Sequence, residues 1–423
     1  MSVIEAQYAA NGSLDMGAVE EGLMTALMKD GCQRLERFFK EHVPICAGEQ
    51  KDGERHYRNR LIQVHSVLGK FRLWRDYFYD GQNGRAPLDE WLGLRDGYTP
   101  GIQRLMARAG SMSPSFERAG EDLKIYARLE IPGRSIQRMM AAIGPEVQTW
   151  LTERPAEIPK QSPAVLYVSY DGTGVPMTRS ETKGRKGKQP DGSAKTREAK
   201  LGCVFTQIRR KNGQPPERDP DSTTHVASFD ESVNFGGLIQ QEAILRGMAY
   251  AKKVVVLGDG AVWIWEVARI YFPGAIQILD LYHAFEHVTE LAQLLYPSEK
   301  DAKRKAELWR KWLKNDKVDQ LIRVATTAAS ARKNPAEVLK AIQYFQTNRD
   351  RMLYASFKKY GYFVGSGVIE AGCKTVVGQR TKQSGMFWHV VGAQNVLSVR
   401  CAVFGRLYDN FWAYKYAQLK QCA

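Results

Sequence analysis

Three acidic residues that lie far apart in the chain are the main candidates for chemistry. Asp171 directly follows an apolar run at residues 165–170, and Asp259 follows a second run at residues 253–258. Glu370 comes after a glycine-punctuated segment, in the first turns of an expected helix. An acid at the end of a buried strand points into the crevice where α/β sheets keep their reactive groups. The pattern therefore predicts that these carboxylates converge at one site.

Carboxylates that converge in this way repel one another unless cations neutralise them. Mg²⁺ prefers oxygen ligands, and two such ions about 3.5–4 Å apart can activate an attacking hydroxyl and stabilise the leaving oxygen of a phosphoryl displacement. Each acid also has an ordinary structural alternative. The aspartates can be turn or cap residues, and Glu370 can complement a helix dipole and pair with Lys374.

The overall charge points to a polyanionic partner. Lys and Arg number 61 against 46 Asp and Glu, which gives a formal net charge of +15. Nucleic acid comes first, although a basic protein whose charge only aids solubility stays an alternative. A hydrophobic fraction of 43% excludes wholesale disorder. Because no apolar run approaches the roughly 20 residues that span a bilayer, no membrane partner is expected.

The cysteines and the amino terminus indicate a reducing compartment. The six cysteines are scattered and include no Cys-x-x-Cys pair, which is neither a disulfide scaffold nor a complete zinc site. Residues 1–5 lack a basic segment followed by an apolar one, so no secretory signal is expected. The expected location is the cytoplasm.

The N-terminal part is expected to be mainly helical with one small hairpin. Residues 18–42 predict an amphipathic helix, and residues 56–64 and 70–79 predict two strands that turn near Gly69. Basic and aromatic residues alternate on these strands. That alternation suits a solvated outer face as well as a nucleic-acid surface.

A helical hairpin is expected next, from residues 115–129 and 134–143. Two helices around a tight turn that contains glycine match a helix-turn-helix in outline. Helical hairpins are common, so DNA reading is one of two open interpretations. If it is right, the recognition helix begins with Arg134, Gln137 and Arg138.

A proline-rich polar segment at residues 154–163 predicts a domain boundary. Beyond the first acidic strand, residues 183–200 are basic and rich in glycine, which is typical of a mobile loop. This loop is either merely solvated or grasps DNA, with Lys183, Arg185 and Lys186 as its candidate contacts.

The acidic strands are expected to belong to a sheet with flanking helices. Further strands are predicted at residues 201–208, 224–229 and 275–279, and helices at residues 235–250 and 261–271. The highly charged helical residues from about 298 to 358 interrupt this region, so they predict an inserted helical subdomain. Its core candidates are Trp309, Trp312, Leu321, Leu339 and Phe345.

A set of ordered motifs resembles those of a known enzyme family. They occupy residues 170–176, 258–261, 278–283, 348–349, 365–374 and 382–388. On these motifs the chain resembles the DDE transposases of bacterial insertion sequences, in particular the ISKra-type (ISKra-four) family, which is related to Mutator-like transposases. The likeness covers most of the chain from Leu88 onward and is densest from Asp171 to Arg400.

The resemblance implies an α/β fold with a ribonuclease-H-like catalytic core, a mixed sheet with flanking helices. An all-helical insertion would interrupt this core, and a mainly helical N-terminal DNA-binding region with a small β hairpin would precede it. The implied pieces are the N-terminal region at 1–160, the first part of the core at 161–282, the insertion at 283–362 and the C-terminal helices of the core at 363–423.

The resemblance also implies that Asp171, Asp259 and Glu370 bind two Mg²⁺ ions, for which Mn²⁺ can substitute. After the second aspartate, the relatives carry an acid or cysteine, two residues and then histidine, which matches Asp280 and His283. His283 would contact a phosphate beside the cut or steady the three acids, unless it only caps its helix.

Residues around the helix of the glutamate are expected to grip DNA near the cut. The basic candidates are Lys374, Arg380 and Lys382, and Trp388 would either stack on a flipped base or pack in the core. Many relatives carry a zinc-ribbon-like cysteine pattern near the amino terminus, which is missing around residues 79–84. The hairpin is therefore expected to bind any DNA without zinc.

In function, the resemblance implies a DNA transposase that binds the terminal inverted repeats of its insertion sequence, cleaves strands and transfers 3′ ends. Its partner would be double-stranded DNA, both element ends and target, bound by a homodimer or larger assembly at the bacterial nucleoid. Two alternatives stay open: a catalytically silent, transposase-derived DNA-binding protein and a structure-selective nuclease on the same fold.

Overall fold

A computed structural model describes residues 15–42, 49–158, 162–187, 189–208, 214–332 and 335–421. The chain forms two compact units. One contains residues up to Ala142 together with those from Asp409 onward, and the other is Ile143–Tyr408. The boundaries expected near residues 160, 282 and 362 stay predictions, because compactness does not show which pieces fold alone. Within the described ranges, no helix combines the length and apolar composition needed to cross a bilayer.

The first unit joins a helix, a hairpin and a helical part. Its elements are α2 (Met16–His42), β1 (Arg55–Ser66), β2 (Gly69–Tyr79), β3 (Gly84–Arg85), α3 (Pro87–Trp91), α4 (Pro100–Met112), α5 (Phe116–Ala127), the first half of α6 (Gly133–Glu153) and nearly all of α18 (Tyr408–Gln421). α2 packs on the hairpin, where the rings of Phe39 and Phe71 stack with centroids 5.4 Å apart. The predicted N-terminal helix and the hairpin that turns near Gly69 are confirmed.

The predicted helical hairpin is confirmed as α5 and α6, with one difference in length. The Ser115 hydroxyl accepts a backbone N–H of the first turn of α5, which is why the helix starts there. α6 continues to Glu153 instead of ending near residue 143, because its apolar spacing continues through the buried Val147 and Leu151.

The second unit carries the sheet and the acidic residues. Its strands are β4 (Leu166–Pro176), β5 (Thr196–Ile208), β6 (Glu217–Arg218), β7 (Thr224–Ser228), β8 (Val254–Gly258) and β9 (Ile276–Leu279). Its helices are α7 (Arg179–Thr182), α8 (Ser232–Leu245), η1 (Met248–Tyr250), α9 (Val262–Tyr271), α10 (Leu281–Leu295), α11 (Glu299–Leu313), α12 (Val318–Ser330), α13 (Ala336–Thr347), η2 (Arg349–Arg351), α14 (Tyr354–Lys359), α15 (Gly367–Gly372), η3 (Cys373–Gly378), α16 (Gln379–Thr381) and α17 (Val390–Phe404).

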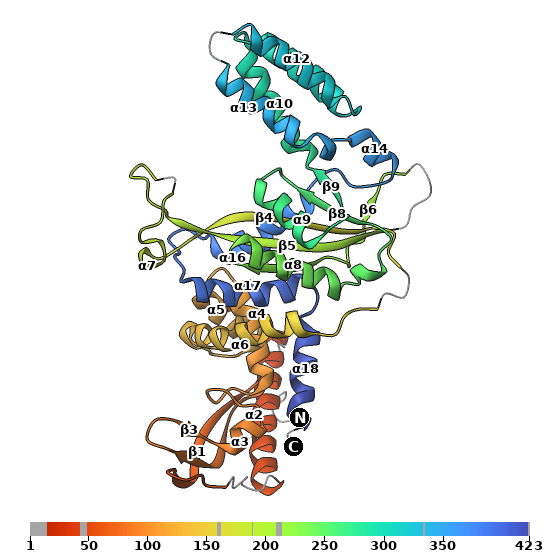
Figure 1. Cartoon of the computed structure of the whole chain (residues 1–423). Coiled ribbons are helices and arrows are strands. Elements are labelled where there is room, and N and C mark those ends of the chain that lie inside the picture. Colours follow the sequence, from red (N-terminus) through yellow and green to blue (C-terminus); the bar gives the residue numbers. More distant parts are fainter. Residues whose placement is uncertain are drawn as a thin grey trace. The chain divides into compact units, whose positions relative to one another are not determined.

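A mixed sheet forms the centre of this unit (Figure 1). β4 pairs with β8 in parallel and with β5 in antiparallel orientation, and β9 extends the sheet parallel to β8. On the other edge, β6 and β7 both pair antiparallel with β5. β5 therefore runs against every strand beside it. This topology is the expected ribonuclease-H-like core, and that prediction is confirmed.

Helices cover both faces of the sheet. Neighbouring residues of a strand point to opposite faces. A Cβ at Gly202 of β5 would lie 2.6 Å from Ile239 of α8, whereas a Cβ at Gly372 of α15 would lie 3.0 Å from Leu201 of β5. α8 and α15 therefore cover opposite faces. Asp171 pairs directly with Leu201, so its side chain lies on the face that α15 covers.

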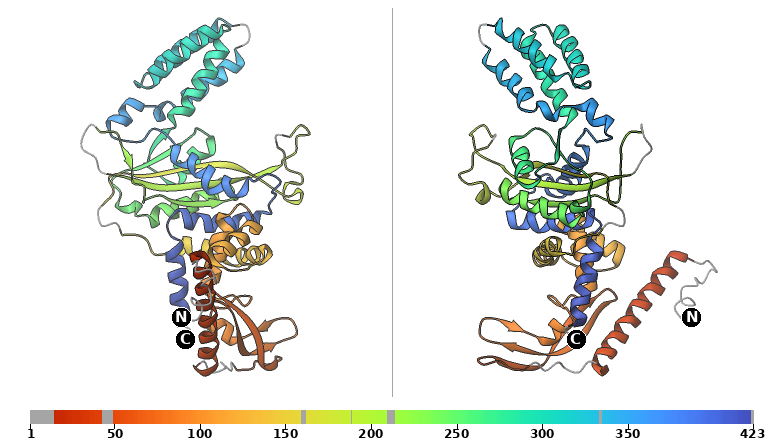
Figure 2. Two further views of the ribbon diagram at one scale, coloured as in Figure 1. Left: turned by 180° about the vertical axis from the view of Figure 1, so that it is seen from behind. Right: turned by 45° about the vertical axis from the view of Figure 1, so that its right-hand side comes forward.

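Two expected boundaries around the first acidic strand are wrong. β4 does not end at Asp171 but continues to Pro176, because it stays paired with β5 back to Thr196. The segment 183–200 is therefore a strand in its last part. Gly172, read from the sequence as part of a turn, lies within this pairing. β4 and β5 form a two-stranded ribbon that extends past β8 (Figures 1 and 2).

The all-helical insertion lies between β9 and α15 and contains α10 to α14. Figure 1 shows α10, α12 and α13 packed together in a bundle that projects from the sheet, with the start of α10 next to β9. Trp309, Leu321 and Phe345 are fully buried there, as predicted. Leu339 is exposed instead of buried, because α13 turns the side that contains Ile342 toward the other helices.

Candidate active site

Asp171, which lies within β4, and Asp259, which directly follows β8, lie at the same end of the parallel pairing of these strands. The last parallel pair of these strands is Ser169 with Leu257, and Asp171 and Asp259 each lie two residues beyond it. Burial, and next the negative charge of Asp259, raise the pKa of Asp171. In the structure, the first two predicted acids are thus close enough for the charge of Asp259 to act on Asp171. We call this region, together with Asp280, His283 and Glu370, the acidic end.

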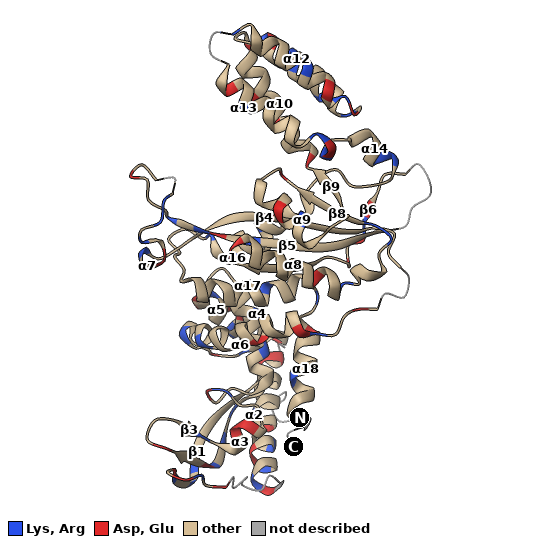
Figure 3. Cartoon of the chain, in the orientation of Figure 1, with Lys and Arg blue, Asp and Glu red and all other residues tan. Residues whose placement is uncertain are grey.

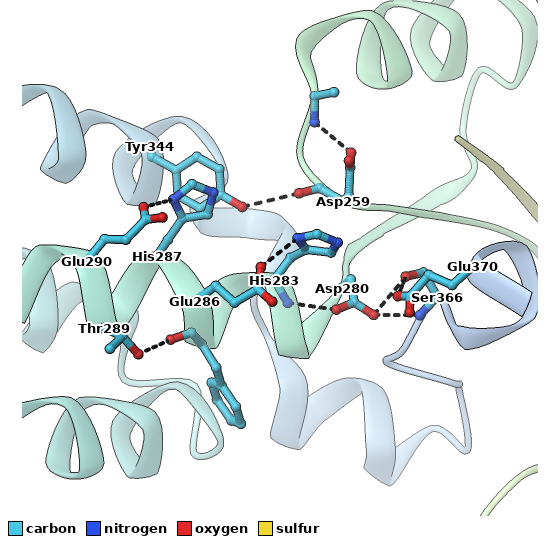
Figure 4. Close-up of polar contacts among 12 residues, drawn as sticks. Asp259, Asp280, His283, Glu286, His287, Thr289, Glu290, Tyr344, Ser366 and Glu370 are labelled. Atoms are coloured by element: carbon cyan, nitrogen blue, oxygen red, sulfur yellow. Dashed lines mark hydrogen bonds and ion pairs between the residues drawn. The ribbon is translucent and has the colours of Figure 1, made fainter. Parts of the chain in front are cut away.

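A tight turn fixes Asp259 (Figure 4). Its Oδ1 accepts the backbone N–H of Ala261 at 2.9 Å, where α9 begins. Gly260 has φ of 102°, which side chains disfavour, and a Cβ there would lie 2.7 Å from the Tyr344 hydroxyl. That hydroxyl is 3.4 Å from the carbonyl oxygen of Asp259, and the Tyr344 ring packs on the His287 ring at an interplanar angle of 36°. The helical insertion therefore contacts the acidic turn directly.

Asp280 follows β9 and caps α10, as Figure 4 shows. Its Oδ1 accepts the backbone N–H of His283 at 2.8 Å. The Nδ1 atom of His283 lies 3.2 Å from Oε2 of Glu286, one turn further along the same helix. The imidazole of His283 lies close enough to act on Asp171 electrostatically, and it opposes the rise in the pKa of Asp171 that burial causes. The histidine predicted from the motif is therefore part of the acidic end.

Glu370 lies on α15, and its carboxylate is hydrogen-bonded to Ser366. Its Oε1 accepts the hydroxyl of Ser366 at 2.8 Å. In the next turn, the thiol of Cys373 donates to Oδ2 of Asp171 at 3.7 Å. Burial, and then the charge of Asp171, raise the pKa of Cys373 to about 12, so the thiol is neutral. The helix of Glu370 thus packs against Asp171 while the Glu370 carboxylate is bonded to Ser366.

The acidic end suits a hard cation by the chemistry of its side chains. Asp171, Asp259 and Glu370 offer the carboxylate oxygens that Mg²⁺ prefers. A cation would also relieve the repulsion that contributes to the raised pKa of Asp171. Among the residues that the structure describes, no three His, Cys, Asp or Glu side chains already converge closely enough to hold a metal ion. Completing a three-acid set requires that the Glu370 carboxylate leave the Ser366 hydroxyl.

The predicted DNA-gripping residues near the helix of Glu370 fall into two groups. Lys374 and Lys382 are exposed, and Nζ of Lys382 contacts Oγ1 of Thr173 on β4 at 2.5 Å. Arg380 and Trp388 are buried, with the guanidinium carbon of Arg380 4.9 Å from the centroid of the Trp388 ring. The expected DNA contact of these last two residues is wrong for this conformation, because they pack on each other below the surface.

The far end of the β4–β5 ribbon carries three more predicted residues. We call Lys183, Arg185 and Lys186 the basic tip; all three are exposed and follow α7. Figure 3 shows Lys and Arg gathered along this end of the ribbon. A bridge between Lys186 and Ser193 turns the segment back on itself.

The residues predicted to read bases lie on α6 in the first compact unit. Arg134, Gln137 and Arg138 are all exposed, and their spacing of three and four residues places them on one side of the helix. The structure thus gives them a shared surface, as a recognition helix requires.

Several residues that hold the acidic end were not identified from the sequence. Arg400 of α17 is buried and donates Nε–H to the carbonyl oxygen of Val376 at 2.5 Å, in the π-helical turn that begins at Cys373. π turns often occur at functional sites. Burial lowers the pKa of Arg400 to about 10, which leaves it charged at neutral pH. Like Ser366 and Tyr344, it acts on a distant element, so no local pattern marks it.

Comparisons with known proteins add a family but no activity. No curated protein matches the chain. Among solved structures, the chain is similar to the Drosophila P element transposase strand transfer complex at 10% identity, over 78% of this chain and 83% of that chain, with a TM-score of 0.28. A likeness at that level carries no argument about function. The model of UPF0236, described as an uncharacterised protein family, matches residues 10–405. The chain therefore belongs to the UPF0236 family.

Proposed function

We propose that the chain is a metal-dependent DNA transposase of the DDE type. The observation that carries the proposal is the placement of Asp171 and Asp259 just past the last parallel pair of β4 and β8, with the helix of Glu370 packed against Asp171. The formal charge of +15 supplies attraction to a phosphodiester backbone. The motif resemblance to ISKra-type transposases supports the finer reaction: binding of terminal inverted repeats, strand cleavage and 3′-end transfer.

In this proposal Asp171, Asp259 and Glu370 bind Mg²⁺, two ions in the site, with Mn²⁺ able to substitute. Bound ions would stabilise negative charge on the attacking and leaving oxygens of the phosphodiester. The chain itself supplies fixed oxygen ligands, since the turn at Ala261 holds Asp259 and the paired ribbon holds Asp171. His283 faces the same region and would contact the phosphate beside the cut.

Different exposed residues would bind different parts of the double-stranded DNA. Lys374 and Lys382 lie next to the acidic end and would hold phosphates near the cut. The basic tip would hold the backbone further along the duplex. Arg134, Gln137 and Arg138 would contact base edges from α6. Element ends and target DNA are the proposed partners, bound by a homodimer or larger assembly.

Nick mapping on cloned element ends tests the proposal. The purified chain, incubated with the ends and Mg²⁺, should cut at the 3′ end of the element and join that end to a target plasmid. Chelation of the metal should stop the reaction, and Mn²⁺ should restore it. A scrambled terminal repeat of the same length is the matched control and should stay uncut. Cutting that needs no divalent ion would contradict the proposal.

One observation favours the catalytically silent alternative. In the described part of the chain no three-residue metal cluster is formed, and Glu370 is bonded to Ser366. Binding of the element ends without nicking in either Mg²⁺ or Mn²⁺ would establish that alternative. Nicking without joining would instead indicate a nuclease on the same fold.

A further inference from the structure

Asp280 is a fully buried carboxylate whose hydrogen bonds connect three separate elements (Figure 4). Its Oδ1 accepts the backbone N–H of His283 at 2.8 Å, in the first turn of α10. Its Oδ2 accepts the backbone N–H of Ser366 at 2.5 Å and the Ser366 hydroxyl at 3.0 Å, just before α15. The backbone N–H of Asp280 donates to the carbonyl of Gly258 at 2.7 Å, at the end of β8. One residue thus joins β8, α10 and α15.

We infer that Asp280 is a positioning residue for the metal site, and that the Ser366 hydroxyl carries its effect to Glu370. The inference rests on the proposed function, since it assigns how that site is assembled. A buried carboxylate needs donors for its lone pairs, because leaving them unpaired is costly. Moving α10 or α15 away would remove donors that water cannot replace. The network therefore fixes the starts of both helices.

Asp280 is not itself placed to bind a cation. Both of its oxygens accept hydrogen bonds, and its side chain has no exposed surface. Glu370 differs, because it is partly exposed and its bond to the Ser366 hydroxyl uses Oε1. Asp280 consequently acts through Ser366, and Glu370 is the carboxylate that can turn to an ion.

The single hydroxyl proton of Ser366 lets Glu370 be held and released. The Ser366 oxygen lies 3.0 Å from Oδ2 of Asp280 and 2.8 Å from Oε1 of Glu370. A hydroxyl donates one proton, so it serves one of these two carboxylates at a time. When Glu370 turns to a cation, Asp280 still accepts that proton. Release of Glu370 therefore leaves no buried donor unpaired, which keeps its cost low.

A binding titration of the purified full-length chain with Mn²⁺ tests the inference without turnover. The electron paramagnetic resonance signal of free Mn²⁺ measures how much of the ion stays unbound. Asp280→Asn replaces one acceptor oxygen by an NH₂ group and should weaken Mn²⁺ binding about 10- to 100-fold, the usual effect of losing a partner behind a metal ligand. Ser366→Ala removes the hydroxyl that Glu370 must leave to reach the ion, so this variant should bind Mn²⁺ more tightly than the wild type. Ser366→Thr keeps the hydroxyl and should bind as the wild type does.

Asp316 in the helical insertion offers a matched control. Its carboxylate accepts the backbone N–H groups of Ala355 and Ser356 at 2.7 and 2.9 Å and the Ser356 hydroxyl at 2.6 Å. It thus caps α14 with the same kinds of donor, but none of the proposed metal ligands lies on that helix. Asp316→Asn should lower the melting temperature and leave Mn²⁺ affinity unchanged.

The outcomes separate this inference from the proposed function. Equal losses of affinity in Asp280→Asn and Asp316→Asn, or wild-type affinity in Asp280→Asn and Ser366→Ala, would overturn the inference alone. If Asp280→Asn does not fold, the Ser366→Ala and Ser366→Thr pair decides in the same way. A wild-type chain that binds no Mn²⁺ would overturn both. Mn²⁺ binding without nicking would overturn the proposed function, and the affinity series would still decide the inference.

Discussion

The acidic end contains Asp171 of β4 and the basic tip lies beyond the far end of the same strand, but the two regions are built in opposite ways. At the acidic end, burial raises the pKa of Asp171, and a Cβ at Gly260 would meet the Tyr344 hydroxyl at 2.7 Å. At the basic tip the cations are exposed, and a Cβ at Gly184 or Gly192 would meet nothing within 4 Å. The packed region fixes positions and the open region supplies charge. Catalysis and DNA affinity should therefore be separable by mutation.

Removing the charge of the basic tip is expected to give the largest difference between the loss of DNA affinity and the loss of catalysis. The triple variant Lys183→Ala/Arg185→Ala/Lys186→Ala should weaken DNA binding, because each phosphate contact releases counterions. The slope of log affinity against log salt should fall by roughly 2–3 if all three residues contact phosphates. Fluorescence anisotropy at several salt concentrations measures this slope. At saturating protein, the rate of nicking should stay close to that of the wild type.

A neutral substitution in the same loop, Gln189→Ala, removes no charge and is the control for the triple variant. It should leave the salt slope unchanged. If the triple variant kept the wild-type salt slope and nicked fully bound DNA slowly, the contrast between the acidic end and the basic tip would be wrong. The basic tip would then act on catalysis and not on affinity.

A smaller effect is expected on stability, through Asp171. Burial and then the charge of Asp259 raise its folded pKa above the unfolded value. Such a group stabilises the fold fully below the unfolded pKa, and this contribution is lost as the pH rises through the folded pKa. Metal-free Asp171→Asn should therefore melt at a higher temperature than the wild type at neutral pH. The difference should shrink in acid, as thermal unfolding at several pH values would measure.

Asp191, near the basic tip, is the matched control with the opposite sign. Hydrogen bonds from the Ser193 hydroxyl and then its backbone N–H lower the pKa of Asp191. Its contribution is present above the unfolded pKa and lost as the pH falls through the folded pKa. Asp191→Asn should thus give no rise in melting temperature at neutral pH. A rise in Asp191→Asn, or a fall in Asp171→Asn, would contradict the contrast between the two regions.

The sequence alone could predict the elements that carry the first two acids. Asp171 and Asp259 each follow a run of apolar residues long enough for a buried strand, and such runs are a local signal. The motifs then supplied the order of the core and its helical insertion, both of which the structure contains. The sequence predicts that the first acidic strand ends where Gly172 follows Asp171, because glycine often marks the end of a strand. Pairing along the whole length of β5 overrides that tendency.

Contacts between distant segments could not be predicted in this way. The bond between Ser366 and Asp280 joins positions 86 residues apart, and no local pattern predicts that these two residues meet. Arg380 and Trp388 suggested a DNA grip because both residue types favour nucleic acid, but side-chain burial depends on what packs above them. Their placement against each other, 4.9 Å from guanidinium carbon to ring centroid, is a property of the folded core.

In the proposed function, the carboxylates of Asp171, Asp259 and Glu370 hold the metal that cuts DNA. The most direct test is the nicking rate of full-length Asp259→Cys, in which a soft thiolate replaces a hard oxygen ligand. We expect this variant to bind element ends as the wild type does, to fail to nick them in Mg²⁺ and to regain nicking in Mn²⁺, which accepts sulfur ligands more readily. Nicking by Asp259→Cys at the wild-type rate in Mg²⁺ would contradict the claim.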